Sequence, residues 1–171
     1  MQLVIRHYRH SDKDTVLSLF SAGNLEHIQP CFNNAIFSPL YITITLVCVL
    51  PDDCYWVAEA EVEGIAQIVG MVAVVGKQSG NEQYGELFRL IIAPTCRRMG
   101  LGVRLTQTVI DFCKERGFSA VVLETKSTQQ AAVALYKKLG FSLVLKHTNS
   151  SVPSWMLMLA RATILRMKKQ L

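Results

Sequence analysis

The sequence lacks several features that mark special classes of protein. Its five cysteines include no CxxC pair, so neither a disulfide framework nor a zinc site is indicated. The chain does not begin with a basic region followed by a long apolar stretch, which argues against a cleaved signal peptide. It has no internal repeat or low-complexity linker. We therefore expect one domain spanning residues 1–171, with reduced thiols in a cytosol-like compartment.

A concentrated block of charge is also missing. The 18 Lys and Arg exceed the 13 Asp and Glu, and the formal net charge of +5 is spread along the chain. This charge favours polyanionic ligands in general. Nucleic acid is not an expected partner, because the sequence has neither a basic stripe nor aromatic platforms for bases.

No apolar run is long enough to span a membrane. The most apolar window, Leu40–Leu50, is closed by Pro51, whereas a spanning helix needs about 20 residues. Two interpretations stay open for the apolar segment 35–50: a buried piece packed on the core, and the shortened remnant of a membrane anchor.

The N-terminal half shows both strand and helix patterns. Leu3–Ile5 predicts a strand, and the cap-type residues Ser11–Asp14 precede a helix that ends near Gly23. Residues 25–34 are ambiguous and suit a second, less regular helix. Residues 55–60 and 65–75 predict two antiparallel strands joined by a hairpin.

The C-terminal half predicts a βαβ crossover. The polar, glycine-bearing stretch 76–85 suggests a loop, and residues 87–92 form a strand that Pro94 stops. A helical stripe then ends at Gly117, before the buried strand Ala120–Leu123. A second helix over 128–139 and strands at 141–145 and 155–159 complete an α/β domain around one mixed sheet.

The segment that carries chemistry lies between this strand and the first helix. It contains two glycines beside paired arginines: Arg97, Arg98, Met99, Gly100, Leu101 and Gly102. Backbone N–H groups at such a helix start bind anions, and glycine lets a phosphate approach closely. The pattern matches neither a Walker loop nor a three-glycine dinucleotide fingerprint. A pyrophosphate site and plain helix capping are both consistent with it.

The surrounding segments resemble two motifs of the GNAT acetyltransferase superfamily. Arg97–Gly102 is similar to motif A, Arg/Gln-x-x-Gly-x-Gly/Ala, and residues 134–141 are similar to motif B, with its Leu-Tyr-x-x-x-Gly-Phe ending. The resemblance implies the GNAT fold, with a mixed, mostly antiparallel central sheet flanked by helices. It also implies acetyl-CoA as co-substrate and no metal.

The same resemblance implies roles for individual residues. The backbone of Leu90, Ile91, Ile92 and Ala93 would pair with the pantetheine arm, and the loop amides would hold the pyrophosphate. Tyr136 would lie near the cofactor sulfur, where its phenol can protonate the leaving thiolate, although helix packing alone also explains a tyrosine there. Gln129 stands where many family members carry Asn.

An amine acceptor must lose a proton before attack, so a base is needed. Glu86 is the candidate, because it precedes Arg97 at the spacing of the catalytic Glu in histone-acetylating members. A solvent-facing glutamate at a strand end is the alternative interpretation. Weaker candidates are Glu82, Tyr84 and Glu124.

The remaining reactive residues are not assigned to the chemistry. The histidines share no spacing with a metal site or a catalytic triad: His7, His10, His27 and His147. Cys96 lies next to the anion loop, but direct transfer to an amine needs no enzyme nucleophile. Arg89 is a candidate for binding a carboxylate of the acceptor.

Within the superfamily, three blocks are similar to the camello or N-acetyltransferase 8-like family: residues 5–12, 54–61 and 85–90. That family carries a long hydrophobic anchor, which implies the endoplasmic reticulum or Golgi membrane. Here only Leu40–Leu50 represents the anchor, so we expect a soluble or peripherally bound chain.

We therefore expect transfer of acetyl from acetyl-CoA to a primary amine, by direct attack in a ternary complex. The resemblance points to the amine of a cysteine S-conjugate or of a protein lysine. A non-catalytic CoA-binding or interaction module with the same fold is the alternative.

Overall fold

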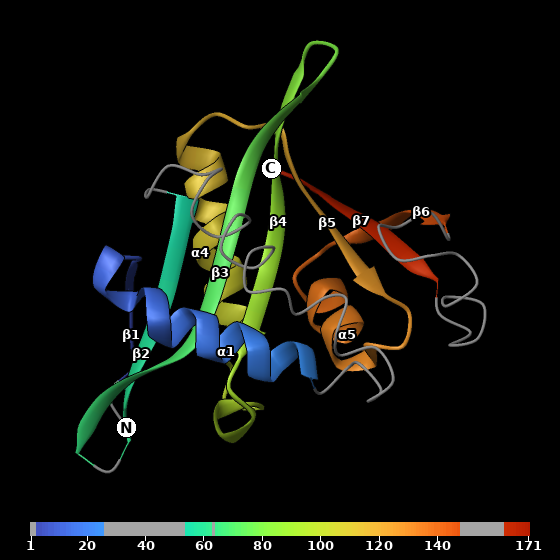
Figure 1. Ribbon diagram of the computed structural model, residues 1–171. Helices are drawn as coiled ribbons and strands as arrows, with labels where there is room; N and C mark the ends of the chain where they lie inside the picture. Colours follow the sequence, from blue (N-terminus) through green and yellow to red (C-terminus); the bar gives the residue numbers. More distant parts are fainter. Residues whose placement is uncertain (1–2, 26–53, 63, 148–162) are drawn as a thin grey trace. The chain divides into compact units, whose positions relative to one another are not determined.

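The computed structural model describes residues 3–25, 54–62, 64–147 and 163–171 (Figure 1). The ambiguous region 25–34, the apolar segment 35–50 and the predicted strand 155–159 fall wholly or almost wholly outside these ranges, so the expectations for them stay predictions. Within the described ranges, none of the helices is long and apolar enough to cross a membrane.

The described strands form a mixed sheet. Seven of them lie in the order β1-β2-β3-β4-β5-β7-β6. They are β1 (Leu3–His7), β2 (Tyr55–Val62), β3 (Ile65–Ser79), β4 (Glu82–Ile92), β5 (Ala120–Lys126), β6 (Ser142–His147) and β7 (Ile164–Gln170). The β4–β5 pair is parallel, and the pairs β1–β2, β2–β3, β5–β7 and β6–β7 are antiparallel. The predicted α/β class with a mostly antiparallel sheet is confirmed.

Three α-helices are described, together with two short 3-10 turns. The helices are α1 (Lys13–Leu25), α4 (Leu101–Glu115) and α5 (Gln130–Lys138), and the turns are η1 (His10–Asp12) and η4 (Pro94–Cys96). The predicted crossover is confirmed, because β4 and β5 are parallel and α4 lies between them in sequence.

The described chain divides into two compact units. Unit 1 comprises residues 1–73 and 89–106, and unit 2 comprises residues 74–88 and 107–171. The division falls within β3, β4 and α4. That the 171 residues form a single domain stays a prediction.

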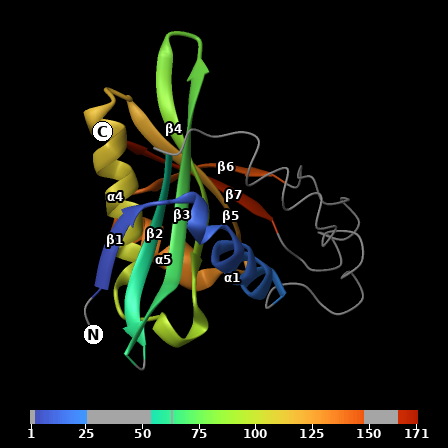
Figure 2. The same ribbon diagram turned by 60° about the vertical axis from the view of Figure 1, so that its left-hand side comes forward.

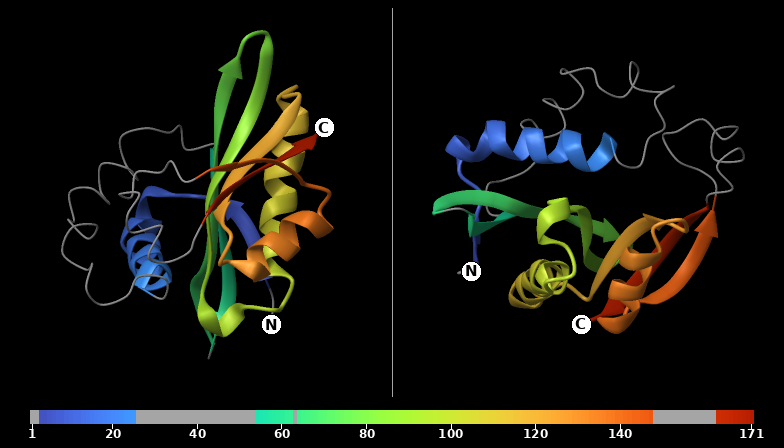
Figure 3. Two further views of the ribbon diagram at one scale, coloured as in Figure 1. Left: turned by 90° about the vertical axis from the view of Figure 1, so that its right-hand side faces the viewer. Right: turned by 90° about the horizontal axis from the view of Figure 1, so that it is seen from below.

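In unit 1, strands β1 to β3 lie between two helices. Figure 3 shows α1 on one side of these strands and the first turns of α4 on the other. The α4 side is closely packed, because a Cβ on Gly70 would lie 3.1 Å from Leu105 Cδ1 and 3.2 Å from Leu101 Cδ2. Leu101 and Leu105 are buried, so this glycine lets the helix approach the strand.

An ion cluster joins the first elements of unit 1. Arg6 on β1 donates to both carboxylate oxygens of Asp12, at 2.7 and 2.9 Å, and also to Glu59 on β2. Asp12 in turn accepts from the backbone N–H of Arg9 at 2.7 Å. Asp12 is buried, so these bonds compensate for its lost hydration.

In unit 2, the second part of α4 and α5 lie on the same side of the strands (Figure 3). The core here includes Val109 and Cys113 of α4, Val121 and Leu123 of β5, and Met167 of β7. A Cβ on Gly85 would lie 2.4 Å from Cys113 Sγ, so β4 can approach α4 only because residue 85 has no side chain.

The predicted loop over 76–85 is wrong. β3 continues to Ser79 and β4 begins at Glu82, and the two strands meet at a tight turn around Gly80 (Figure 2). The polar residues that suggested a loop lie on exposed strand, where no apolar alternation is needed. Gly80 has φ +58°, which the turn requires.

β7 was not predicted. It supplies the antiparallel neighbour of β5 along its whole length, from Ala120 opposite Gln170 to Lys126 opposite Ile164. Its buried residues alternate with Arg166 and Lys168, which are only half-buried. The expectation that a strand at 155–159 would finish the sheet is incomplete, since β7 follows it in sequence.

Candidate active site

The second half of β4 changes backbone conformation at Arg89, which has φ +58°. This left-handed conformation is uncommon for a residue with a side chain and marks a break in regular strand geometry. The ladder between β4 and β5 pairs Tyr84 with Ala120 and ends with Leu87 opposite Leu123.

Strand alternation assigns the backbone groups that follow Arg89. Ala93 donates its N–H to Val69 on β3 at 2.8 Å. Because neighbouring residues of a strand direct their backbone groups to opposite sides, Leu90 and Ile92 direct theirs away from β3. These two residues are therefore the ones of the predicted set whose amides face the other edge of β4.

The turn between β4 and α4 contains two left-handed residues. Arg98 has φ +62° and Gly100 has φ +79°, and Met99 between them is 55% exposed. A turn with left-handed residues directs successive N–H groups toward one side, which makes a concavity for anions. No atom lies within 4 Å of the position of a Cβ on Gly100, so the surface there is open.

α4 begins directly after this turn. Arg104 donates its N–H to the carbonyl of Gly100 at 3.1 Å, and Thr106 donates its hydroxyl to the carbonyl of Gly102 at 2.8 Å. The first N–H groups of a helix have no acceptor within it, and they carry the positive end of its dipole. The residues from Arg98 to Gly102 thus combine the two features that an anion site needs.

The two arginines of the turn differ. Arg97 Nε donates to the carbonyl of Ile92 at 3.3 Å, so its side chain folds back toward the end of β4. Arg98 is exposed. Arg97 is exposed as well, and the prediction that both arginines contribute charge to the anion site is untested.

Arg89 contacts an aromatic ring of α1. Its guanidinium carbon lies 4.7 Å from the centroid of Phe20. A cation over an aromatic face is stabilised by the ring quadrupole. This contact gives Arg89 a packing role within unit 1, and its predicted role toward an acceptor carboxylate is untested.

Glu86 lies on β4 in unit 2, half-buried, with Lys77 Nζ 2.5 Å from its Oε2. Because Gly85 faces Cys113 of α4, strand alternation turns Glu86 to the face away from that helix. The candidate base therefore lies on the face of β4 away from α4, with its Oε2 buried beside a cation.

Tyr136 lies on α5 and is buried, with its ring edge-on to Phe141 at 5.7 Å between centroids. Burial raises the pKa of its phenol to about 12, since the phenolate would lose hydration. The phenol therefore stays protonated throughout the neutral range and is available as a proton donor.

Gln129 immediately precedes α5. Its Oε1 accepts from the hydroxyl of Thr125 at 3.0 Å, and Thr125 is buried on β5. This bond holds the amide of Gln129 in one orientation. Sequence reasoning did not identify Thr125 as a partner of Gln129.

The weaker base candidates are joined to β7. Lys168 Nζ lies 3.3 Å from Glu82 Oε2, and Arg166 Nη1 lies 2.9 Å from Glu124 Oε1. His147 Nε2 is 3.4 Å from the same oxygen of Glu124. Sequence reasoning missed Arg166 and Lys168, because only strand pairing brings β7 beside β5.

No group of His, Cys, Asp or Glu in the described ranges has an arrangement that could hold a metal ion. Of the histidines, His27 lies outside those ranges. Cys96 is buried at the end of η4, beside the anion turn.

Residues 22–141 match the model of the acetyltransferase (GNAT) family. Since this match covers well over half of the sequence, the chain belongs to that family. The family takes its acetyl group from acetyl-CoA, so the chain is an acetyl-CoA-dependent N-acetyltransferase.

The chain is similar to camello and N-acetyltransferase 8 proteins, as the sequence blocks predicted. It is 30% identical to the probable N-acetyltransferase camello of Xenopus laevis over 192 aligned positions, which cover 80% of this chain and 84% of that protein. It is 27% identical to human N-acetyltransferase 8, with 80% and 83% covered. Each alignment is longer than the 171 residues of this chain, so these relatives have residues with no counterpart here.

Solved structures confirm the fold. A chain of the NatC complex bound to Gag peptide and CoA superposes with a TM-score of 0.75 at 17% identity, covering 100% of this chain and 99% of that one. The ribosomal-protein-S18-alanine N-acetyltransferase of Escherichia coli gives 0.70 at 18%, with 99% and 94% covered. The GNAT fold predicted from motifs A and B is therefore confirmed.

Proposed function

We propose that the chain transfers acetyl from acetyl-CoA to a primary amine by direct attack in a ternary complex. The observation that carries this proposal is the turn before α4, where Arg98 and Gly100 are left-handed and the first amides of the helix follow. This is the geometry that a pyrophosphate needs. It lies in the segment that the sequence had matched to motif A.

The donor is assigned to this turn and to β4. The amides from Arg98 to Gly102 hold the pyrophosphate, with the charge of Arg98 beside it. The outward backbone groups of Leu90 and Ile92 pair with the amides of the pantetheine arm. Both contacts use the main chain and therefore tolerate side-chain variation.

The transfer itself needs one proton removed and one supplied. The amine nitrogen forms a bond to the thioester carbonyl carbon, and the carbon–sulfur bond breaks. Glu86 takes the proton that the amine loses, directly or through a water, and the Tyr136 phenol gives a proton to the departing sulfur. The protons balance, since the amine loses one and the thiol gains one.

The test is incubation of the wild-type protein with acetyl-CoA and a broad amine panel, with mass spectrometry of the products. Tyr136→Phe and Glu86→Gln should keep acetyl-CoA binding while turnover falls about 100-fold or more. Glu115→Gln, an exposed carboxylate on α4, is the matched control and should leave both unchanged.

Two results would contradict the proposal. Wild-type protein that binds acetyl-CoA but acetylates no amine would support the alternative, a non-catalytic CoA-binding module. Full turnover in both variants would remove Glu86 and Tyr136 from the mechanism. The panel includes cysteine S-conjugates and lysine peptides, which separates the two acceptor classes that the family resemblance suggests.

The family resemblance also suggests a location on the endoplasmic reticulum or Golgi membrane. We propose that this chain binds such membranes peripherally or not at all, because Leu40–Leu50 is shorter than a span of about 20 residues. Extraction of cell membranes with alkaline carbonate tests this. A chain that stays in the pellet would contradict it.

A further inference from the structure

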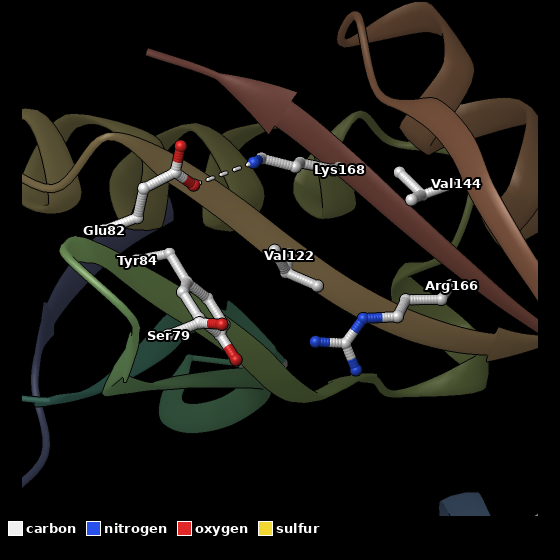
Figure 4. Close-up of a pocket in the computed structure, with 7 residues that line it drawn as sticks. All are labelled: Ser79, Glu82, Tyr84, Val122, Val144, Arg166 and Lys168. Atoms are coloured by element: carbon white, nitrogen blue, oxygen red, sulfur yellow. Dashed lines mark hydrogen bonds and ion pairs between the residues drawn. The ribbon is translucent and has the colours of Figure 1, made fainter.

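A pocket of about 190 Å³ opens on the strands of unit 2. Figure 4 shows the guanidinium of Arg166 and the ring of Tyr84 on one side of Val122, and the ammonium of Lys168 directed toward Glu82 on the other. Its lining comes from five strands: Ser79, Glu82, Tyr84, Val122, Val144, Arg166 and Lys168. We propose that this pocket is an acceptor subsite, in which Arg166, with Lys168 beside it, binds a carboxylate of the amine substrate. The inference rests on the proposed acetyl transfer.

The pocket and the candidate base share one face of the strands. Glu86 is opposite Val122 on β5, and Val122 is opposite Lys168 on β7. Adjacent strands are about 4.8 Å apart, so this row places the base roughly 10 Å from the cationic strand. The charge of Glu86 also acts on Arg166. An acceptor whose amine lies at Glu86 can therefore extend a second group into the pocket.

Arg166 keeps hydrogen-bonding capacity for a ligand. Its Nη1 donates to Glu124 at 2.9 Å, and it also bonds to the side chain of Tyr84. A guanidinium has five N–H donors in a planar fork. The donors beyond these two bonds suit a carboxylate, which binds a guanidinium with two parallel hydrogen bonds.

Lys168 can exchange its partner at little cost. Its ammonium is 3.3 Å from Glu82, whose side chain is 60% exposed. An exposed pair of this kind contributes little to stability, so an incoming carboxylate replaces Glu82 easily. The side chains of Val122 and Val144 offer an apolar wall for the carbon skeleton between the two groups.

The same charges select against a phosphate. Glu82 and Glu124 hold negative charge beside both cations, which opposes a dianion more strongly than a monoanion. A single carboxylate therefore fits better than a phosphate monoester.

The experiment compares matched acceptors that differ only in the carboxylate and are long enough to extend from Glu86 to the pocket, such as 6-aminohexanoic acid and pentylamine. For the wild type we expect higher kcat/KM with the carboxylate-bearing member of each pair. Arg166→Gln should lower that value about 10- to 100-fold, as expected for losing a charged hydrogen bond, and should change the neutral amine by less than about twofold. The KM for acetyl-CoA should not move.

Two further variants separate binding from folding. Arg166→Gln leaves the Glu124 carboxylate without this partner. The double variant Arg166→Gln/Glu124→Gln also removes the negative charge of Glu124, and it should still show no preference for the carboxylate-bearing amine over the neutral one. Lys114→Gln makes the same charge change on an exposed site of α4 and should keep the preference. Thermal unfolding of each variant checks that the protein is folded.

Titration calorimetry with the same two amines separates this inference from the proposed function. If neither amine is acetylated but 6-aminohexanoic acid binds more tightly than pentylamine, and Arg166→Gln removes the difference, the subsite stands and the proposed activity fails. The subsite is overturned if the wild type makes no distinction in rate or binding, or if Arg166→Gln weakens both members equally.

Discussion

The guanidinium of Arg6 is shared by two carboxylates, and one of them, Asp12, is buried. The hydrogen bond from Arg6 is the main reason that the pKa of Asp12 lies below its usual value of 3.8. A carboxyl with a lowered pKa in the folded state stabilises the fold above its unfolded pKa. That contribution is lost as the pH falls below about 3.8.

Asp12→Asn should therefore lower the free energy of unfolding at pH 7 by about 2 kcal/mol, because a charged hydrogen bond is lost. Urea denaturation across pH 2 to 7 should also show a shallower loss of stability in acid for the variant. Asp14→Asn, an exposed change in the same first turns, is the control and should follow the wild type. Equal acid slopes for Asp12→Asn and wild type would refute this account.

The buried phenol of Tyr136 predicts how the rate of acetyl transfer depends on alkaline pH. Since burial raises the pKa of its phenol to about 12, the proton needed by the leaving thiolate stays on the phenol at pH 7 to 10. The rate of acetyl transfer should therefore show no loss from titration of Tyr136 below about pH 11. A pH–rate profile measures this, and an alkaline limb near pH 10 that disappears in Tyr136→Phe would contradict it.

At the scale of elements, the turn before α4 depends on the left-handed Gly100. Gly100→Ala meets no atom within 4 Å, so its cost is backbone strain of about 1 kcal/mol. Any relaxation of the turn also redirects the amides, so we expect the Kd for acetyl-CoA to rise about tenfold. Calorimetry and urea denaturation measure the two effects.

Gly64 provides the matched control. It has φ +78° in the β2–β3 turn and also faces open space, so Gly64→Ala carries the same backbone strain. It should lose similar stability and keep wild-type affinity for acetyl-CoA. If both variants bind equally well, the turn before α4 does not hold the cofactor.

Much of the element order could be predicted from local patterns. The β2–β3 hairpin follows from β-rich runs around Gly64, and the parallel β4–β5 pair follows from strand, helix and strand in succession. The last residues of β3 and the first residues of β4 could not be predicted as strand. These segments are exposed and contain residues such as Lys77 and Glu82, so they lack the apolar alternation that indicates a strand.

The residues of the candidate site also fall into those that the sequence predicts and those that it does not. The turn before α4 and Tyr136 were found because each lies in a short, continuous motif. The bond from Thr125 to Gln129 and the pocket cations Arg166 and Lys168 were missed, because they depend on how strands and helix ends meet. A sequence read in one dimension does not state which strand β5 will pair with.

At the scale of the whole chain, the last strand completes unit 2. β7 pairs with both β5 and β6 and buries Leu165 and Met167. Deleting residues 164–171 should therefore abolish the cooperative unfolding transition, which circular dichroism during heating will show. Deleting Leu171 alone, an exposed residue after the end of β7, is the control and should leave a folded protein. A stable truncated chain that binds acetyl-CoA would contradict the prediction.

The close approach of β4 to α4 at Gly85 and Cys113 makes the Cys113 thiol a reporter of local opening between this strand and this helix. The Cys113 thiol is fully buried beside Gly85 of β4. An alkylating reagent therefore reaches it only when α4 separates from β4. The alkylation rate at Cys113, followed by peptide mass spectrometry, therefore counts these openings directly. A ligand bound at the start of α4 should lower the alkylation rate at Cys113, and a ligand bound elsewhere should leave that rate unchanged.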